Sequence, residues 1–276
     1  LYQTVGVVMK SLLDIVKQVN ASEQELPFSV YSSIKEQNLS NVPIAKPLLI
    51  VVLSGDKVLG QENKITCQAG DFIFLSDSPA VNMRNIPKNK AYYALLIDFD
   101  YEDIKGLESS ISSKKNYLVG KTTMLLEQCL QQFVESALWA PTAIISLRKR
   151  EIIELLIHLG HQDISSLLGT PMLKNRLHEL FLLKGFTGLT TTIICDQLAL
   201  SESTLRRKLK REGTSIQQIK DLARLGLGVH LLQTTEQPIG LISDACGYQS
   251  QSRFTERFKH RFGLTPTELR LTKMAD

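Results

Sequence analysis

The feature that most restricts the fold of this chain is a two-helix unit that occurs twice in its last third. The later copy, residues 242–266, reads as a short helix, a turn at Gly247 and a second helix with Ser250 as its N-cap. Three phenylalanines recur at positions i, i+4 and i+8 and predict one buried stripe: Phe254, Phe258 and Phe262. The opposite face is polar and basic, as in a helix that reads the major groove of DNA.

Clear signals end this second helix and begin another. Gly263 stands where a helix commonly takes a left-handed C′ residue. Thr265, Pro266 and Glu268 then supply an N-cap, a proline at the first helical position and the acid of a capping box. We therefore predict a new helix from Thr265 onward.

The earlier copy, residues 194–211, has the same order of parts. A shift of 49 positions places Leu205 on Phe254 and Leu209 on Phe258, and Ser201 takes the place of the second N-cap. Between the copies, residues 216–234 continue with the apolar period of a helix. That helix would be roughly 28 Å long, close to the roughly 34 Å of one DNA turn. One chain is thus predicted to place two recognition helices in successive major grooves.

Several residues of this region stand in a characteristic order: the segment 201–210, Arg224, Leu231, Leu232, Gly247, Tyr248, Ser252, Phe254, Phe258, Lys259, Phe262, Gly263, Thr265, Pro266 and Arg270. With them, residues 172–273 resemble the DNA-binding domain of the AraC/XylS family of bacterial transcription regulators. The chain departs from the family at Cys195, Ser243 and Gly228, where alanine is usual. Gly226 and Gly228 each cost the linker helix about 1 kcal/mol relative to alanine.

The outward faces of the two recognition helices supply the predicted DNA contacts. For base edges we predict Ser203, Arg206, Arg207, Gln251, Ser252, Arg253 and Glu256. For phosphates we predict Lys208, Lys210, Arg211, Arg257, Lys259 and Arg261.

Two of these positions carry specific expectations. Arg206 or Arg207 is predicted to contact guanine, because the guanidinium fork meets O6 and N7 together. Glu256 takes the position equivalent to Arg207. Its carboxylate either accepts from a cytosine amine or pairs with Arg253 or His260, and the sequence does not decide between them.

Charge and cysteine content agree with an intracellular DNA-binding protein. Residues 170–276 hold 16 Lys+Arg and 10 Asp+Glu, a net of +6, whereas residues 1–169 are at −2. The four cysteines, Cys67, Cys129, Cys195 and Cys246, form no CxxC pair, so we expect no zinc site and no disulfide framework. No run of residues approaches a membrane span or a signal peptide, and a cytoplasmic location is predicted.

The first part of the chain has the texture of a β-domain. Short β-like runs separated by turn residues occur at residues 28–34, 48–54, 57–59, 64–67, 71–75, 80–86 and 92–98. This spacing predicts a β-sandwich or a small barrel. Residues 48–55 and 67–75 resemble the cupin-like sensor barrel of AraC-type regulators, which implies a small-molecule effector whose binding residues the sequence leaves unknown.

An enzyme built on this domain is disfavoured. All five histidines, His158, His161, His178, His230 and His260, lie outside the β region, so no histidine-ligated metal and no cofactor are expected there. His158 and His161 are predicted to be near neighbours on a helix, as packed or solvated residues rather than metal ligands. A DNA-repair methyltransferase would need an activated cysteine, and Cys67 has no basic neighbour in sequence.

Arg84 is the only arginine before Arg148, which suggests an anchor for an anionic effector. Strand alternation with Val81 and Met83 instead predicts that Arg84 faces water.

Helices are predicted on both sides of the β region. Residues 5–19 form an opening amphipathic helix, with Val8, Leu12 and Val19 among its apolar positions. Residues 119–162 hold two more, which either cover the barrel or, for the segment 144–160 with its near-heptad spacing, pair two chains. Residues 163–170, before Pro171, are the predicted linker.

The predicted fold class is α+β: a cupin-like β-barrel with a helical dimerisation segment, then an all-α domain with two helix-turn-helix motifs joined by a linker helix. The predicted domains are 1–118 for sensing, 119–168 for dimerisation and linkage, and 172–276 for DNA binding. The predicted function is a sequence-specific transcription regulator, an activator, that binds double-stranded DNA, a small-molecule effector and RNA polymerase as a homodimer. A ligand-independent regulator with a vestigial barrel and, less favoured, a barrel enzyme fused to a DNA-binding domain are the alternatives.

Overall fold

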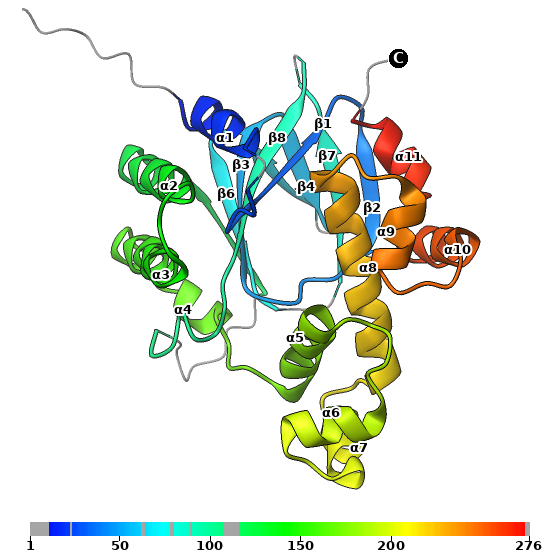
Figure 1. The fold of residues 1–276 in the computed structure, drawn as a ribbon. Coiled ribbons are helices and arrows are strands. Elements are labelled where there is room, and N and C mark those ends of the chain that lie inside the picture. Colours follow the sequence, from blue (N-terminus) through cyan, green and yellow to red (C-terminus); the bar gives the residue numbers. More distant parts are fainter. Residues whose placement is uncertain are drawn as a thin grey trace, which may run out of the picture.

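The computed structural model describes residues 11–22, 24–61, 64–77, 80–88, 90–107 and 116–273. The predicted α+β class is confirmed (Figure 1). In the described residues one helix, α1 (Leu12–Asn20), is followed by nine strands: β1 (Ser29–Ser33), β2 (Gln37–Val42), β3 (Leu48–Ser54), β4 (Asp56–Leu59), β5 (Ile65–Gln68), β6 (Asp71–Leu75), β7 (Val81–Ile86), β8 (Tyr92–Asp98) and β9 (Tyr117–Lys121).

The strands form two antiparallel sheets. One has the order β1-β8-β3-β6-β9 and the other the order β2-β7-β4-β5. Register is regular in the centre, where Leu49 of β3 pairs with Phe74 of β6 and with Ile97 of β8. Among the described residues no strand pairing joins the two sheets, so the predicted β-barrel is not closed, and the strands form the sandwich that the strand spacing gave as the other possibility.

The central strands are buried on both faces. Leu49 and Val51 of β3 belong to a core shared with helices, whereas Ile50 and Val52 belong to the core between the sheets. Successive side chains of a strand point to opposite faces, and both faces are covered here. These strands therefore read as continuous apolar runs rather than as an alternating pattern.

Four helices cover the outer face of the five-stranded sheet, at the left of Figure 1: α1 (Leu12–Asn20), α2 (Met124–Ser136), α3 (Thr142–His158) and α4 (Ile164–Leu167). Leu12 and Val19 of the predicted opening helix are buried in this core, and Val8 lies outside the described residues. The apolar stripe of α3, with Ile145, Ile152 and Leu156, is also buried there. That stripe covers the sheet and is not free to pair two chains.

Two strands, β2 and β9, were not predicted from the sequence. β2 is mostly polar, and Asn41 lies inside it with φ of 50° at an irregularity in the pairing with β7. β9 is an edge strand on β6 and crosses residue 118, in a region expected to turn helical. The predicted linker is also partly folded, because Ile164, Leu167 and Leu168 are buried in the N-terminal core.

The remaining helices are α5 (Leu173–Lys184), α6 (Thr191–Leu198), α7 (Glu202–Arg211), α8 (Ile216–Thr234), α9 (Ile239–Ala245), α10 (Gln251–Phe262) and α11 (Pro266–Leu271). They build two small cores. One is formed by α5, α6, α7 and the first half of α8, and the other by the second half of α8 with α9, α10 and α11. α8 has the predicted bounds and runs through both cores.

The β-domain takes part in the second of these cores. Leu39 of β2 is buried in the same cluster as Phe258 and Phe262 of α10. α10 packs along β2 and α8 packs against β1, whereas α6 and α7 project away from the sheets (Figure 1). The two helical units therefore differ in how they meet the β-domain.

A series of buried side-chain hydrogen bonds also links the β-domain to the C-terminal helices. Lys57 Nζ donates to Asn85 Oδ1 at 2.8 Å, and Asn85 Nδ2 donates to Gln37 Oε1 at 2.8 Å. Gln37 Oε1 also accepts from Gln233 Nε2 of α8 at 3.0 Å, and Gln37 Nε2 donates to Thr272 Oγ1 at 2.7 Å. Buried polar groups usually have hydrogen-bond partners, and Gln37 has two of its three, Gln233 and Thr272, in the C-terminal part of the chain.

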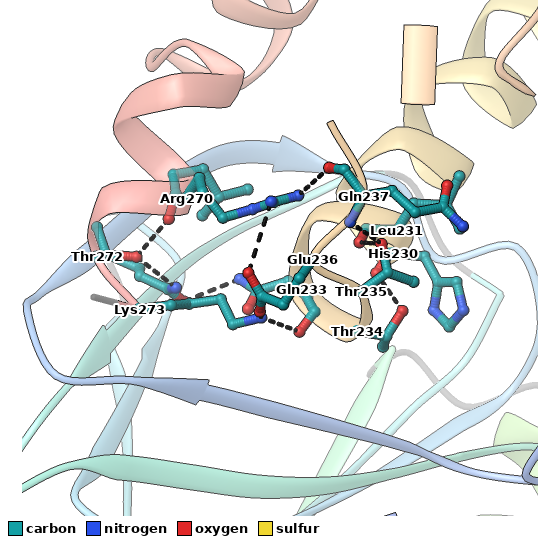
Figure 2. Close-up of polar contacts among 12 residues, drawn as sticks. His230, Leu231, Gln233, Thr234, Thr235, Glu236, Gln237, Arg270, Thr272 and Lys273 are labelled. Carbon is teal, nitrogen blue, oxygen red and sulfur yellow. Dashed lines mark hydrogen bonds and ion pairs between the residues drawn. The ribbon is translucent and has the colours of Figure 1, made fainter. Parts of the chain in front are cut away.

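The C-terminal turn of the chain is tied to the end of α8, as Figure 2 shows. Arg270 Nη2 donates to the carbonyl of Gln237 at 3.0 Å, and Lys273 Nζ donates to the carbonyl of Gln233 at 2.9 Å. The carbonyl of Thr272 in turn accepts from the backbone N–H of residues 34 and 35 between β1 and β2. The end of the chain thus closes the second helical unit onto the β-domain.

Candidate DNA-binding interface

The first helix-turn-helix consists of α6 and α7. Ala199 ends α6 in the left-handed conformation, with φ of 52°. Ser201 Oγ then accepts from Thr204 N at 3.3 Å and caps α7 as predicted. Leu205 and Leu209 are buried, which turns the remaining side chains of α7 outward.

The second helix-turn-helix consists of α9 and α10. Gly247 makes the turn with φ of 73°, and Ser250 Oγ accepts from Arg253 N at 3.4 Å. The predicted phenylalanine stripe is confirmed, with ring centroids 5.5 Å and 4.6 Å apart along Phe254, Phe258 and Phe262. Gly263 closes α10 in the left-handed conformation, and Thr265 and Glu268 form the expected capping box before α11.

The duplication contains one difference that the sequence comparison missed. The recognition helices align with a shift of 49 positions, but the buried residues Ile194 and Leu198 of α6 correspond to Ile242 of α9 and to its C-cap Cys246 with a shift of 48. The turn of the second motif is therefore one residue longer. Gly247, with φ of 73°, corresponds to Ala199, with φ of 52°, so the added residue lies between Gly247 and the N-cap Ser250.

Gly228 in α8 allows a close approach between helices. A Cβ atom there would lie 2.9 Å from Cε2 of Phe254, closer than carbon atoms pack. A Cβ at Gly226 would be only 3.6 Å from Cγ of Pro43, an ordinary contact. A side chain at position 226 is thus sterically tolerated, whereas position 228 requires glycine.

The structure leaves twelve of the thirteen predicted DNA contacts exposed to solvent: Ser203, Arg206, Arg207, Lys208, Lys210, Arg211, Gln251, Ser252, Arg253, Glu256, Arg257 and Lys259. Within α7, Arg206 forms an exposed ion pair with Glu202 at 2.6 Å. Such a pair is worth little in water and gives way to a stronger partner. Glu256 forms no ion pair with Arg253 or His260 in the described part of the chain.

The thirteenth residue, Arg261, is half-buried at the junction with the β-domain. Its Nε donates to the carbonyl of Asn41 at 2.9 Å, and burial lowers the pKa of its guanidinium. In this arrangement part of the guanidinium is already bonded to β2.

His161 and Cys67 both pack against apolar side chains of the β-domain. His161 lies beyond the end of α3, not on it, and its ring packs edge-on against Phe72 at 5.1 Å. No group of three metal-ligating side chains occurs in the residues described. Cys67 is buried and unpaired, and burial raises the pKa of its thiol to about 11, which opposes a nucleophilic role.

Arg84 follows the strand-alternation prediction. Its side chain is partly exposed and pairs with Glu36 at 2.6 Å, on the outer side of the four-stranded sheet. Its neighbour Asn85 is buried, on the face that the same alternation gives to Met83. No helix in the described part of the chain has the length and apolar character that a membrane span requires.

The C-terminal part is a tandem helix-turn-helix domain, because two helices with buried apolar and exposed basic faces, α7 and α10, are joined by the single helix α8. Residues 194–272 match the family model described as "Helix-turn-helix domain". The porin thermoregulatory protein EnvY of Escherichia coli is 40% identical over 74 residues, which are 27% of this chain and 29% of that protein. The regulator GadX of Escherichia coli is 29% identical over 124 residues, 45% of this chain and 42% of GadX.

The chain thus spans less than half the length of these curated relatives. The fold of nearly the whole chain is similar to crystal structures of ToxT from Vibrio cholerae. An apo form has a TM-score of 0.66 at 16% identity, covering 92% of this chain and 100% of that one. A form with unsaturated fatty acid bound has a TM-score of 0.63 at 16% identity, covering 92% and 99%. At this identity the likeness establishes the fold alone.

Proposed function

We propose that the protein is a sequence-specific, DNA-binding transcription regulator that performs no catalysis. The observation that carries this proposal is the pair of exposed, basic recognition helices, α7 and α10, mounted on the single helix α8. α8 is 19 residues long, which spaces the two helices on the scale of one DNA turn, roughly 34 Å.

We propose the following roles for the predicted DNA contacts. Ser203, Arg206 and Arg207 of α7 and Gln251, Ser252, Arg253 and Glu256 of α10 read base edges. Lys208, Lys210, Arg211, Arg257, Lys259 and Arg261 hold phosphates. The absence of an ion pair at Glu256 among the described residues supports acceptance from a cytosine amine. Arg261 would have to exchange its bond to Asn41 for a phosphate.

The test is selection of bound fragments from genomic DNA, followed by footprinting at two salt concentrations. We expect a protected site of about two helical turns with two unlike elements about one turn apart. Weak, length-dependent and steeply salt-sensitive binding with no preferred fragment would contradict specific reading.

We further propose that a small-molecule effector acts through the N-terminal domain. A ToxT structure described with an unsaturated fatty acid bound supports this class of control for the shared fold. A cleft of about 380 Å³ lies where the loop of Pro43 and Ile44 meets Lys174 and His178 of α5 and Leu222 of α8. Affinity for the selected DNA should change when fatty acids or other metabolites are added, because an effector must bind two states unequally to shift them.

A ligand-independent regulator remains the second candidate, and one observation favours it. The space between the two sheets is filled by buried side chains, among them Ile50, Val52, Leu59, Ile73 and Tyr92. If no metabolite alters DNA affinity or protects the β-domain from hydrogen exchange, this second candidate is the better description.

We propose three further features of the regulator. The chain divides into a sensor (1–118), a helical segment (119–168) and a DNA-binding domain (172–276). It forms a homodimer within the segment 144–160, through the exposed side of α3 at Ile144 and Leu147, since the other side is buried. It activates transcription by contact with RNA polymerase. Sedimentation tests the dimer, and transcription in vitro with purified polymerase tests the activation.

A further inference from the structure

The two helix-turn-helix units are joined by a helix with a weak point in its middle. Ile219 and Ala223 of α8 belong to the first unit's core, and Leu225 and Val229 belong to the second. The two glycines, 226 and 228, lie at this change of core. Because glycine loses more conformational freedom than any other residue in a helix, α8 alone holds the angle between the units poorly.

Arg224 bridges the two units at this same place. Its Nη2 donates to the carbonyl of Gly247, in the turn of the second motif, at 2.9 Å. Its guanidinium carbon lies 5.7 Å from the ring centroid of Phe186 and 5.2 Å from that of Tyr248. Phe186 belongs to the core of the first unit, and Tyr248 packs against that of the second. The guanidinium is therefore in contact with an aromatic ring of each unit.

Phe186 and Arg224 also lie close to the backbone of Gly247, in the turn of the second motif. A Cβ atom added at Gly247 would lie 2.7 Å from Cβ of Phe186 and 3.3 Å from Nη2 of Arg224. The first unit thus reaches the backbone of the second motif's turn directly. A bend of α8 at its glycines would pull Phe186 and Tyr248 apart and would break the contacts of Arg224.

We infer that Arg224 is a positioning residue that fixes the angle between the two recognition helices, and that it thereby sets the spacing of DNA elements the protein accepts. Arginine suits this role because its planar guanidinium contacts aromatic faces and donates hydrogen bonds in a fixed geometry. The residue makes no contact with DNA in this role. It restricts which pairs of elements both helices can reach together.

The inference rests on the proposed DNA binding, so its first test does not use DNA. Spin labels are attached at Ser203→Cys on α7 and Ser252→Cys on α10, both exposed, in a background with Cys195→Ala. The distance distribution between the labels should broaden in the Arg224→Ala variant. Arg211→Ala, which removes an exposed arginine outside the bridge, should leave the distribution unchanged. An unchanged width in the Arg224 variant overturns the inference.

The second test measures binding to the selected DNA with one base pair inserted between its two elements, which rotates one element by roughly 35° relative to the other. We expect the wild-type protein to lose about tenfold in affinity, comparable to a mismatched base pair, and the Arg224→Ala variant to lose less than about threefold. A variant that merely folds less well would lose affinity for both DNA molecules by the same factor. If the ratio of affinities for the original and the lengthened DNA is the same in the wild-type protein and the variant, the inference is wrong and the proposed function is unaffected.

A second substitution tests whether Arg224 acts by holding the angle between the two helical units. Gly226→Ala adds a methyl group with only an ordinary contact to Pro43 and stiffens α8. Added to Arg224→Ala, it should narrow the label distribution and restore the preference for the original spacing. Failure of the wild-type protein to select any DNA would sink the proposed function, while the label distances would still decide the role of Arg224.

Discussion

Leu39 lies in a strand of the β-domain but is buried in the core of the second helix-turn-helix, at 3% exposure. We predict that Leu39→Ala lowers the free energy of unfolding by about 3 kcal/mol, within the 2–5 kcal/mol typical of buried leucines truncated to alanine. The cost has two parts, the lost burial of the removed methyl groups and the cavity left beside Phe258 and Phe262. This substitution should differ from an ordinary core defect because the lost stability is expected in α10, outside the β-domain that holds Leu39.

The assay is chemical denaturation combined with hydrogen exchange of the α10 amides. The matched control is Leu59→Ala in β4, because Leu59 is equally buried in the four-stranded sheet but contacts only the core between the sheets. Both variants should lower overall stability by similar amounts. Only Leu39→Ala should selectively raise exchange at α10, since local opening free energies follow local packing.

A shared core has a further consequence for DNA binding. The footprint of the Leu39 variant should weaken at the element read by α10 and persist at the element read by α7, which projects away from the sheets (Figure 1). Exchange of α10 amides that matches the Leu59 control would refute the reasoning. It would mean that the second helical unit is stable without the β-domain.

Three other predictions can be checked separately. Arg207→Ala should relax specificity at one base pair, whereas Lys210→Ala should weaken all sequences alike and reduce the salt slope by about one; equal losses on specific and random DNA would contradict the assignment. Ala199→Gly should stabilise the protein by roughly 1 kcal/mol, because Ala199 has the left-handed conformation that glycine adopts without cost. The control Ala245→Gly, in the helix α9, should destabilise it by about as much, and thermal unfolding measures both changes. Burial lowers the pKa of Lys57 to about 8, so stability should rise as pH increases from about 8 to 10.4, and Lys57→Met should remove that rise in denaturant titrations.

The folded and unfolded states bind different numbers of protons at Lys57 above pH 8. Above pH 8 the folded protein has released the Lys57 proton, whereas the unfolded chain retains it up to about pH 10.4. The unfolded state then binds more protons, and stability rises with pH. Below pH 8 both states are protonated, and the cost of burying the charge is present in full.

Much of the fold could be predicted because it follows from local signals. The strands 48–54, 71–75 and 92–98 and the helix 216–234 have the predicted bounds, since long apolar runs and helical periods depend little on distant residues. The outward faces of α7 and α10 follow from the same period once Leu205 and Phe258 are taken as buried. The caps at Ser201 and Ser250 were likewise evident from sequence.

What could not be predicted depends on partners far away in the chain. β2 has a polar sequence that does not itself favour a strand, and its pairing with β7 and the packing of Leu39 on α10 are long-range contacts. The same holds for α3, whose apolar stripe suited either a sheet or a second chain. Residues Gln37 and Gln233 are 196 positions apart, and no local pattern links them.

The contacts across the junction are unequal in strength, and this inequality suggests the order in which a signal would travel. α5 meets the β-domain through part-exposed ion pairs, such as Lys46 to Glu179 at 3.3 Å and Lys174 to Asp77 at 3.8 Å. Contacts of this kind contribute little net stability because water competes for both groups. α10 instead shares a buried core and the bond of Arg261 to Asn41. A shift of the β-domain would therefore move α10 first, and the contacts of Arg224 would pass that movement to the first unit.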